Sequence, residues 1–333
     1  MATATERDLL VPSQTTMQAA QLVEPGKLEL VEVVRPNPAP NEARIRLEGC
    51  GVCASNLPPW EGKPWFSYPM APGALGHEGW GRVDAVGEEV TGFAPGDRVG
   101  LLSQHAYAQY DVAPQDALVR LPPRLSDDPF PAEPLGCALN IFRRSEIRSG
   151  QTVAILGIGF LGALLTQLAS RAGARVLAIS RRDFALEMAW KMGAAETISL
   201  GERHQIIDRV RELTTGKFCE VVIEAVGKQE PLDLATELAA ERGRLIIAGY
   251  HQDGLRQVNL QLWNWRGLDV INAHERDPAI YRGGMQRAVE AVARGLLTPG
   301  LLYTHTFPLS ELGTALRLTA ERPLGFMKAL IAL

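Results

Sequence analysis

The chain has 333 residues, of which 46% are apolar and 22% charged, and its net charge is −4. This length exceeds what one hydrophobic core normally serves and predicts two domains, while the composition is typical of a globular protein. Lysines and arginines are scattered along the chain instead of forming a basic stripe, which argues against nucleic acid as a partner. The longest apolar stretch, residues 153–169, contains three glycines and is too short for a membrane span, so we expect no membrane partner either.

The N-terminal residues 1–16 carry acidic side chains and lack the apolar segment of a secretory signal. We expect them to form a flexible extension. Only four cysteines occur, too few for a disulfide framework in a chain of this length. A reducing cytoplasm is therefore the predicted compartment.

The first third of the chain has the pattern of short β-strands. Such runs occupy residues 17–23, 27–34, 43–49, 81–86, 98–102 and 107–112, with Gly/Pro turns between them. Strands at 152–156 and 175–180 then alternate with helices at 162–172 and 184–192, and further apolar runs follow at 221–225 and 244–248. This alternation predicts a doubly wound parallel sheet, and thus an α/β protein with a mostly β first domain.

Roughly the last sixty residues contain one helix-like stretch, 284–294, followed by short β-like runs, the last of which is 327–332. Such a segment is too small to form a domain alone. We expect it to pack back onto the N-terminal β domain, which makes the α/β part an insertion in the middle of the chain.

A glycine-rich turn joins the first predicted strand of the α/β part to its helix. Gly157 would allow the tight turn, Gly159 the approach of backbone amides to a pyrophosphate, and Gly162 the close packing of helix on strand. The phosphate would rest at the helix N-terminus, where free N–H groups and the helix dipole favour an anion. The pattern predicts a dinucleotide site; the alternative is an ordinary turn between a strand and a helix.

The end of the next strand distinguishes the two nicotinamide cofactors. Ser180, Arg181 and Arg182 stand where an acidic residue would bind the ribose 2′-hydroxyl. Two guanidinium groups suit a 2′-phosphate, so the sequence favours NADP(H) over NAD(H). Asp183 is better placed as the N-cap of the next helix than as that acid. The alternative for the arginines is a solvated helix entrance.

Cys53, His77 and Glu78 form a candidate metal set upstream of the glycine turn, with Glu133 or Cys137 available near the entry to the α/β part. Catalytic zinc takes about three ligands from Cys, His and carboxylate and keeps one position open. Taken singly, such a cysteine is more often a small buried hydrophobe and such a histidine a core residue. A redox pair of Cys50 and Cys53 is disfavoured, because they lie in a β-domain turn.

Five motifs in this order resemble the medium-chain dehydrogenase/reductase family, and within it the zinc-dependent alcohol and polyol (sorbitol-type) dehydrogenases. They are Gly51-Val-Cys53-Ala-Ser55-Asn56, Gly76-His77-Glu78-Gly79-Trp-Gly81, Pro95-Gly96-Asp97-Arg98-Val99, Glu133-Pro134-Leu135 and Gly157-Ile-Gly159-Phe-Leu-Gly162. The resemblance implies a GroES-like catalytic domain built from residues 17–138 and 275–333. It also implies a Rossmann domain at residues 139–274.

The same resemblance assigns roles around the metal. It implies that Cys53 and His77 bind zinc, that Glu78 is a ligand or near-ligand, and that Glu133 is the third protein ligand, with Cys137 left to packing. It also implies that Ser55 starts a proton relay.

Two features differ from the family. Asn56 replaces the usual aspartate and removes a charge near the metal. No cysteine occurs in residues 100–109, so we expect one catalytic zinc and no structural zinc.

The predicted cofactor groove combines the glycine turn with the ends of three further strands. Its residues are Gly157, Gly159, Phe160, Leu161, Gly162, Ser180, Arg181, Arg182, Ala225, Val226, Ala248, Gly249 and Tyr250. The resemblance further implies a homodimer or homotetramer, commonly joined through the Rossmann sheets.

The predicted reaction is the reversible oxidation of an alcohol to its carbonyl compound, with a secondary, polyol or cyclic alcohol as substrate. Trp60, Trp65, Phe66 and Tyr68 either line the substrate site or pack as a lid. One alternative is a zinc-free quinone or enoyl reductase of the same fold. Another is a non-catalytic nucleotide-binding protein.

Overall fold

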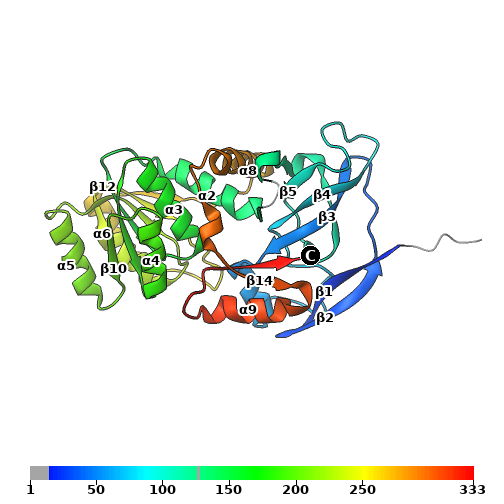
Figure 1. Ribbon diagram of the computed structural model, residues 1–333. Coiled ribbons are helices and arrows are strands. Elements are labelled where there is room, and N and C mark those ends of the chain that lie inside the picture. The colour runs from blue at the N-terminus through cyan, green and yellow to red at the C-terminus, as the bar shows by residue number, and fades with distance from the viewer. Residues whose placement is uncertain (1–14, 126–127) are drawn as a thin grey trace, which may run out of the picture.

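The computed structural model describes residues 15–125 and 128–333, and it has a β-rich lobe and an α/β lobe (Figure 1). The predicted flexible extension lies almost wholly outside the described residues, and Thr16 already begins the first strand. Both the N-terminal strands and the C-terminal strand belong to the β-rich lobe, as the sequence predicts.

The β-rich lobe is built on a seven-stranded sheet in the order β14-β15-β3-β4-β5-β7, with β6 paired to β3, and a separate pair β1-β2. The bounds are β1 (Thr16–Glu24), β2 (Lys27–Val34), β3 (Glu42–Gly51), β4 (Gly79–Val86), β5 (Arg98–Leu101), β6 (Tyr110–Pro114), β7 (Leu118–Arg120), β14 (Tyr303–Pro308) and β15 (Lys328–Ala332). Alternation along β3 sends Ala43, Ile45 and Leu47 into the core of this lobe.

The α/β lobe contains a six-stranded parallel sheet in the order β10-β9-β8-β11-β12-β13, which is the Rossmann order. The strands are β8 (Thr152–Leu156), β9 (Arg175–Ser180), β10 (Glu196–Ser199), β11 (Cys219–Glu224), β12 (Ala239–Ile247) and β13 (Asp269–Asn272). Alternate residues of β8 face two different cores. Val153 and Ile155 pack in one, Ala154 and Leu156 in the other. This topology confirms the predicted α/β fold, with a mostly β lobe and a doubly wound Rossmann sheet.

Helices cover both faces of the parallel sheet (Figure 1). The helices of the chain are η1 (Ala54–Asn56), α1 (Leu57–Trp60), η2 (Gln115–Ala117), η3 (Pro123–Leu125), α2 (Ala132–Ser145), α3 (Phe160–Arg171), α4 (Asp183–Lys191), α5 (Arg203–Leu213), α6 (Gln229–Leu238), α7 (Leu260–Arg266), α8 (Pro278–Ala293), η4 (Pro299–Leu302), η5 (Leu309–Glu311) and α9 (Leu312–Glu321). Helix α2 packs lengthwise on α8, and the predicted domain limit at 138/139 falls in the middle of α2. In the described part of the chain, no helix has the length and apolar character needed to cross a bilayer.

The sequence locates the strongly apolar strands well and the short polar ones poorly. The predicted bounds of β8 and β9 agree with the structure. The strand predicted at 107–112 is wrong in position, since β6 is Tyr110–Pro114. Strands β7, β10 and β13 have no more than four residues each, and no periodicity can be recognised over so short a run.

A buried ion pair joins the N-terminal and the C-terminal segments of the chain within the β-rich lobe. Lys328, the first residue of β15, is 5% exposed, and Glu78, which precedes β4, is fully buried. The lysine Nζ donates to Glu78 Oε1 at 2.7 Å. Because removing one partner of a buried pair leaves an uncompensated charge, the C-terminal strand cannot lose this lysine without a large cost.

We expect Lys328→Met to lower the free energy of unfolding by about 3–5 kcal/mol, because Glu78 then remains buried without its counter-charge. Urea denaturation followed by tryptophan fluorescence measures the change. Lys27→Met is the matched control, since Lys27 pairs with Glu24 and Glu29 on the surface and should leave the unfolding midpoint where it is. Equal midpoints for the two variants would contradict the expectation.

Candidate metal and dinucleotide site

Two neighbouring strands bring Cys53, His77 and Glu78 together. Cys53 follows the end of β3 and the other two precede β4, and these strands run antiparallel with Cys50 opposite Gly79. Cys53, just after the end of β3, therefore lies at the same end of this strand pair as His77 and Glu78, just before the start of β4. One ligand atom from each of the three residues lies within 4.8 Å of the others. In residues 15–125 and 128–333, no other group of this kind occurs.

The His77 ring is oriented by a backbone carbonyl. Its Nδ1 lies 2.9 Å from the Leu75 oxygen. A carbonyl can only accept a hydrogen bond, so Nδ1 carries a proton and Nε2 is the nitrogen left for a metal. This arrangement is common among metal-binding histidines.

Glu78 brings a carboxylate oxygen that no hydrogen bond satisfies. Its side chain occupies space that is open only because residue 51 is glycine, since a Cβ there would lie 1.8 Å from Glu78 Oε2. Lys328 Nζ lies 2.5 Å from Oε2, but this buried oxygen accepts no hydrogen bond. A thiol, an imidazole nitrogen and a carboxylate are a donor set that fits zinc.

Glu133, the remaining predicted ligand, lies beside this cluster rather than within it. Its Oε1 accepts hydrogen bonds from Tyr281 Oη at 2.8 Å and from Cys137 Sγ at 3.3 Å. Burial is the main cause of a raised Glu133 pKa, and the charge of His77 opposes it. Both hydrogen bonds fall on Oε1, so Oε2 keeps its lone pairs. Tyr281 could not be found from sequence, because 148 residues separate it from Glu133.

Ser55 and Asn56 belong to the short helix η1 next to Cys53. Ser55 is half-buried, and within the described part of the chain its hydroxyl has no hydrogen-bond partner. Asn56 is only 2% exposed and donates from Nδ2 to the Leu75 oxygen at 2.9 Å. The serine hydroxyl is thus available to a ligand, whereas the asparagine amide is committed to the protein.

The aromatic residues between the metal-site segments have different surroundings. Trp60 packs against the core of the β-rich lobe, and Tyr68 donates its hydroxyl proton to the Pro59 oxygen. Trp65 is 57% exposed and its ring is tilted against that of Phe66 at 6.1 Å. The packing interpretation therefore holds for Trp60, and Trp65 is the ring most free to contact a ligand.

The glycine turn has the geometry expected of a dinucleotide fingerprint. Gly157 has a φ of +95°, and a Cβ there would lie 2.4 Å from Val226 Cγ2. A Cβ on Gly162 would lie 2.0 Å from the Gly157 oxygen, which explains the third glycine. At Gly159 the same Cβ would meet nothing within 4 Å, and this residue begins α3 without a side-chain cap. Open space therefore faces the free N–H groups of a helix N-terminus, which suits an anion.

Three arginines lie near the end of β9. Arg182 donates to the Phe326 oxygen at 2.7 Å and to the Ile158 oxygen at 3.3 Å, so it joins the glycine turn to the C-terminal segment. Burial lowers the pKa of Arg182, and the charge of Arg322 adds to this; burial and then Arg181 act likewise on the pKa of Arg322. Among the described residues none of these arginines forms an ion pair. The cluster carries uncompensated positive charge.

Ser180 is 7% exposed, and its Oγ accepts a hydrogen bond from the Arg182 N–H at 3.4 Å. The predicted N-cap role of Asp183 is wrong. Helix α4 begins at Asp183, and the N-cap position is Arg182. Helix boundaries cannot be located from sequence to better than about two residues.

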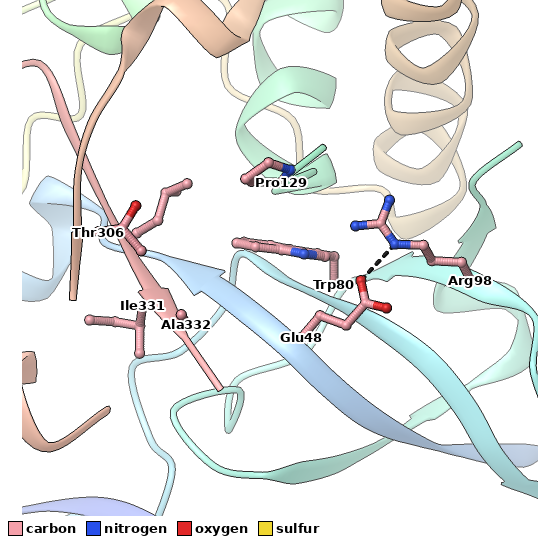
Figure 2. Close-up of a pocket in the computed structure, with 8 residues that line it drawn as sticks. Glu48, Trp80, Arg98, Pro129, Thr306, Ile331 and Ala332 are labelled. Atoms are coloured by element: carbon pink, nitrogen blue, oxygen red, sulfur yellow. Dashed lines mark hydrogen bonds and ion pairs between the residues drawn. The ribbon is translucent and has the colours of Figure 1, made fainter. Parts of the chain in front are cut away.

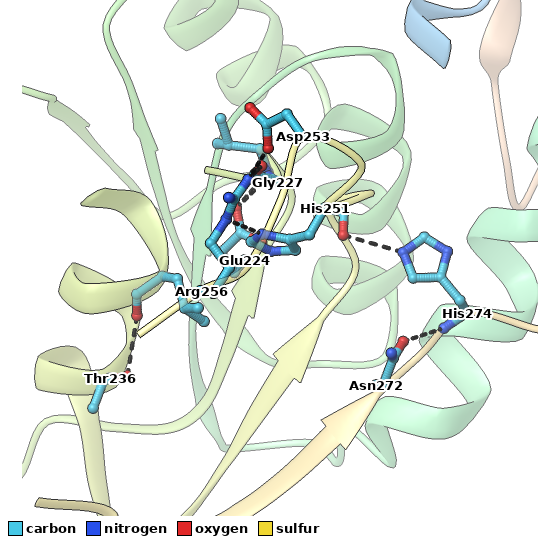
Figure 3. Close-up of polar contacts among 11 residues, drawn as sticks. Glu224, Gly227, Thr236, His251, Asp253, Arg256, Asn272 and His274 are labelled. Atoms are coloured by element: carbon cyan, nitrogen blue, oxygen red, sulfur yellow. Dashed lines mark hydrogen bonds and ion pairs between the residues drawn. The ribbon is translucent and has the colours of Figure 1, made fainter. Parts of the chain in front are cut away.

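The ends of β11 and β12 are joined by a buried carboxylate (Figure 3). Glu224 is fully buried, and its Oε1 accepts from the N–H groups of Val226 and Gly227, both at 2.7 Å. Its Oε2 accepts from His251 Nε2 at 3.0 Å, while Arg256 Nε donates to His251 Nδ1 at 2.9 Å. Because Nδ1 accepts, His251 is neutral and carries its proton on Nε2. The network fixes the backbone beside the predicted cofactor residues Ala225 and Val226.

The segment after β12 is held from the other side by His274 (Figure 3). Ala248 is buried, and both its N–H and that of Gly249 donate to the Glu224 backbone oxygen. His274 Nε2 lies 3.1 Å from the Gly249 oxygen, and its ring meets that of the half-exposed Tyr250 edge to face at 5.3 Å. Ala248, Gly249 and Tyr250, which the sequence predicts as cofactor residues, are thus each held by contacts with Glu224 or His274.

A pocket of about 240 Å³ is lined by residues from β3, β4, β5, β14 and β15 of the seven-stranded sheet (Figure 2). Trp80 and Pro129 line it together with the ion pair of Glu48 and Arg98. None of its lining residues belongs to the metal or dinucleotide set.

A Rossmann sheet with its glycine turn, beside a Cys-His-Glu cluster in a GroES-like lobe, defines a dehydrogenase. A sequence model of the zinc-binding dehydrogenases matches residues 161–290, and one of the alcohol dehydrogenase GroES-like domain matches residues 39–123. The chain belongs to the medium-chain dehydrogenase/reductase family, in its zinc-type branch, and is an oxidoreductase of the alcohol dehydrogenase type.

Individual relatives agree with this assignment. An alcohol dehydrogenase of Rhizobium meliloti is 31% identical over 270 residues, which cover 70% of this chain and 77% of the relative. A quinone oxidoreductase of Pseudomonas aeruginosa is 30% identical over 249 residues, which cover 73% and 75%. A crystallised protein of Sinorhizobium meliloti, assigned as a zinc-binding dehydrogenase and bound to NADP, is 26% identical. It has a TM-score of 0.82, with 96% of this chain and 100% of that chain covered.

The protonation of His77 leads to a pH prediction for the metal-free protein. Burial would lower the pKa of His77, but the hydrogen bond with Cys53 and the charges of Cys53, Glu133 and Glu78 outweigh it and raise that pKa to about 10. A metal ion must displace this proton, so apparent zinc affinity should rise about tenfold for each pH unit between pH 7 and 9. Titration calorimetry in buffers of different ionisation enthalpy measures the released proton; affinity that does not change with pH would contradict the expectation.

The same pKa has a consequence for stability without metal. The folded pKa of about 10 lies above the ordinary value near 6.5 of an unfolded chain. The stabilisation is then complete below about pH 6.5 and is lost as pH rises through 10. The unfolding midpoint of the metal-free protein, followed across this window, measures it.

Proposed function

We propose that this protein interconverts a secondary, polyol or cyclic alcohol and its carbonyl compound with NADP(H) and one catalytic zinc ion. The observation that carries the proposal is the Cys53-His77-Glu78 cluster, whose atoms lie within 4.8 Å of one another. Cys53 Sγ, His77 Nε2 and a carboxylate oxygen would hold the metal. Glu78 Oε2 and Glu133 Oε2 are the two candidates for that oxygen, because neither accepts a hydrogen bond from the described residues.

The residues around the cluster would have separate roles in the reaction. When bound, zinc would polarise the substrate oxygen and the nicotinamide would exchange the hydride. Ser55, two residues after Cys53 and with no hydrogen-bond partner among the described residues, would accept the proton of the substrate alcohol while passing its own hydroxyl proton on towards solvent, and the reverse reaction would run the same relay backwards. The Nδ1–H group of His77 donates its hydrogen bond to the Leu75 oxygen, so His77 would take no part in this proton transfer.

The preference for NADP(H) is supported by the arginines at the end of β9. Arg182 is held by two backbone carbonyls, which leaves the exposed Arg181 as the guanidinium most free to bind a 2′-phosphate. Arg322 adds positive charge to the same region. No carboxylate forms an ion pair with these side chains among the described residues, so their positive charge is available to an anion. The NADP bound by the Sinorhizobium relative agrees with this choice.

The glycine turn supports the proposed cofactor placement. The pyrophosphate would lie over Gly159, against the first N–H groups of α3, with Phe160 and Leu161 in that helical turn. The segment Ala248-Gly249-Tyr250 would contact the nicotinamide from the neighbouring strand end. Residues 139–274 are proposed as the nucleotide domain, with α2 passing across its border.

A zinc-free quinone reductase is the second candidate, favoured by the quinone oxidoreductase that is 30% identical. Such an enzyme would have no use for a buried carboxylate beside a thiol and an imidazole. The metal content of the protein distinguishes the two candidates.

The assembly and the compartment are proposed on separate grounds. Strand β13 is an edge of the described parallel sheet, and the preceding segment exposes Trp265 by 86% and Leu260 by 58%. Burial of this edge against a second copy would give a homodimer or homotetramer. All four cysteines are free, which suits a reducing cytoplasm.

The metal proposal predicts that the purified protein contains about one zinc ion per chain and that chelation abolishes turnover of alcohols and carbonyls with NADP(H). Elemental analysis and a coupled absorbance assay measure both. Cys53→Ser should lose zinc, whereas Cys219→Ser, in a buried strand of the Rossmann sheet, should keep it. A zinc-free protein that reduces quinones at full rate in the presence of chelator would favour the second candidate.

The cofactor proposal predicts that Arg181→Ala weakens NADPH binding by about 10- to 100-fold, because a charge-assisted contact with phosphate contributes about 1.5–3 kcal/mol. NADH binding should stay unchanged and serves as the internal control. Fluorescence titration of both cofactors measures the two dissociation constants. A wild-type protein that binds NADH as tightly as NADPH would overturn the assignment.

A further inference from the structure

The backbone carbonyl of Leu75 is contacted by both Asn56 and His77. Leu75 has a φ of +74°, a left-handed conformation that residues with a side chain rarely adopt. Its oxygen lies 2.9 Å from His77 Nδ1 and 2.9 Å from Asn56 Nδ2. A carbonyl oxygen has two lone pairs and can accept both hydrogen bonds at once. The unusual backbone conformation thus presents one acceptor to two donors.

Asn56 is fixed at both ends of its amide. Its Oδ1 accepts from Tyr107 Oη at 2.8 Å and from the Cys53 N–H at 3.3 Å, while Nδ2 donates to Leu75. Since the Leu75 oxygen can only accept, the atom facing it must be the amide nitrogen. The side chain is 2% exposed, so water does not compete for these contacts. One amide therefore connects the Cys53 segment with the His77 segment.

We propose that Asn56 is a positioning residue which, through the Leu75 carbonyl, holds His77 in the orientation and tautomer that leave Nε2 to the metal. The inference rests on the proposed zinc site and adds a requirement to it. Residue 56 must be an amide, because it has to donate at one end and accept at the other. The asparagine is then no weakened form of the aspartate that the family resemblance leads one to expect at this position.

An aspartate at position 56 distinguishes geometry from charge. Its carboxylate would set a second acceptor against the Leu75 oxygen, with no proton between them, and would push that oxygen away from His77. Coulomb attraction alone would have the opposite result, because an added negative charge near the cluster favours a divalent cation. The two accounts therefore predict changes of opposite sign for one substitution.

The test is the zinc dissociation constant of Asn56→Asp, measured by competition with a chromophoric chelator. We expect zinc binding to weaken by about 10- to 100-fold, the effect usual for partners of metal ligands. Tyr107→Phe is the matched control. It removes a hydrogen bond to Oδ1 but leaves the donor to Leu75, and should stay within about threefold of wild type. Equal or tighter zinc binding by Asn56→Asp overturns the proposal.

A measurement on the metal-free wild type keeps the test independent of variant folding. Two protons that point at one oxygen lie close together, so an NMR cross-peak is expected between the Asn56 side-chain amide and His77 Hδ1. Absence of that cross-peak overturns the shared-carbonyl arrangement. A wild-type protein that shows the cross-peak but binds no zinc would reject the proposed function while leaving the Asn56-Leu75-His77 arrangement intact.

Discussion

The buried contact between Glu78 and Lys328 is the constraint on which the rest of the site depends. The lysine pairs with a carboxylate of the Cys-His-Glu cluster and also lies over the ring of Phe160, 4.9 Å from its centroid. One cation from the last strand thus touches both the metal cluster and the glycine turn. Because Lys328 balances the charge of Glu78, this pair adds no net charge to the cluster.

Backbone groups, more than side chains, give the site its precision. The Leu75 oxygen orients His77, and the Phe326 and Ile158 oxygens hold Arg182. On the side of the predicted cofactor groove the roles are reversed, because the Glu224 carboxylate accepts from the backbone N–H groups of Val226 and Gly227. Hydrogen bonds of this kind fix the direction in which each group points, which is what positioning for hydride transfer requires.

The sequence predicts local features of this protein well and long-range contacts hardly at all. The glycine turn and the strands β8 and β9 carry signals within a few residues, and the structure has them where expected. Cys53, His77 and Glu78 follow from motif spacing, and the structure brings them together. Partners such as Tyr281 and Lys328 lie 148 and 250 residues from the groups they contact, so no local pattern could reveal them. Asn56 carried a visible signal, but its meaning depends on the Leu75 carbonyl, which only the fold supplies.

The position of Lys328 in the chain also bears on biosynthesis. A ribosome makes the Cys-His-Glu segment first, then the whole parallel sheet, residues 152–272, and afterwards the strand that holds the lysine. Until β15 emerges, Glu78 lacks the counter-charge of Lys328 and the β-rich lobe lacks the strand between β3 and β14. The seven-stranded sheet can therefore be completed only after the parallel sheet has been synthesised, and the Cys-His-Glu cluster gains its lysine partner after both.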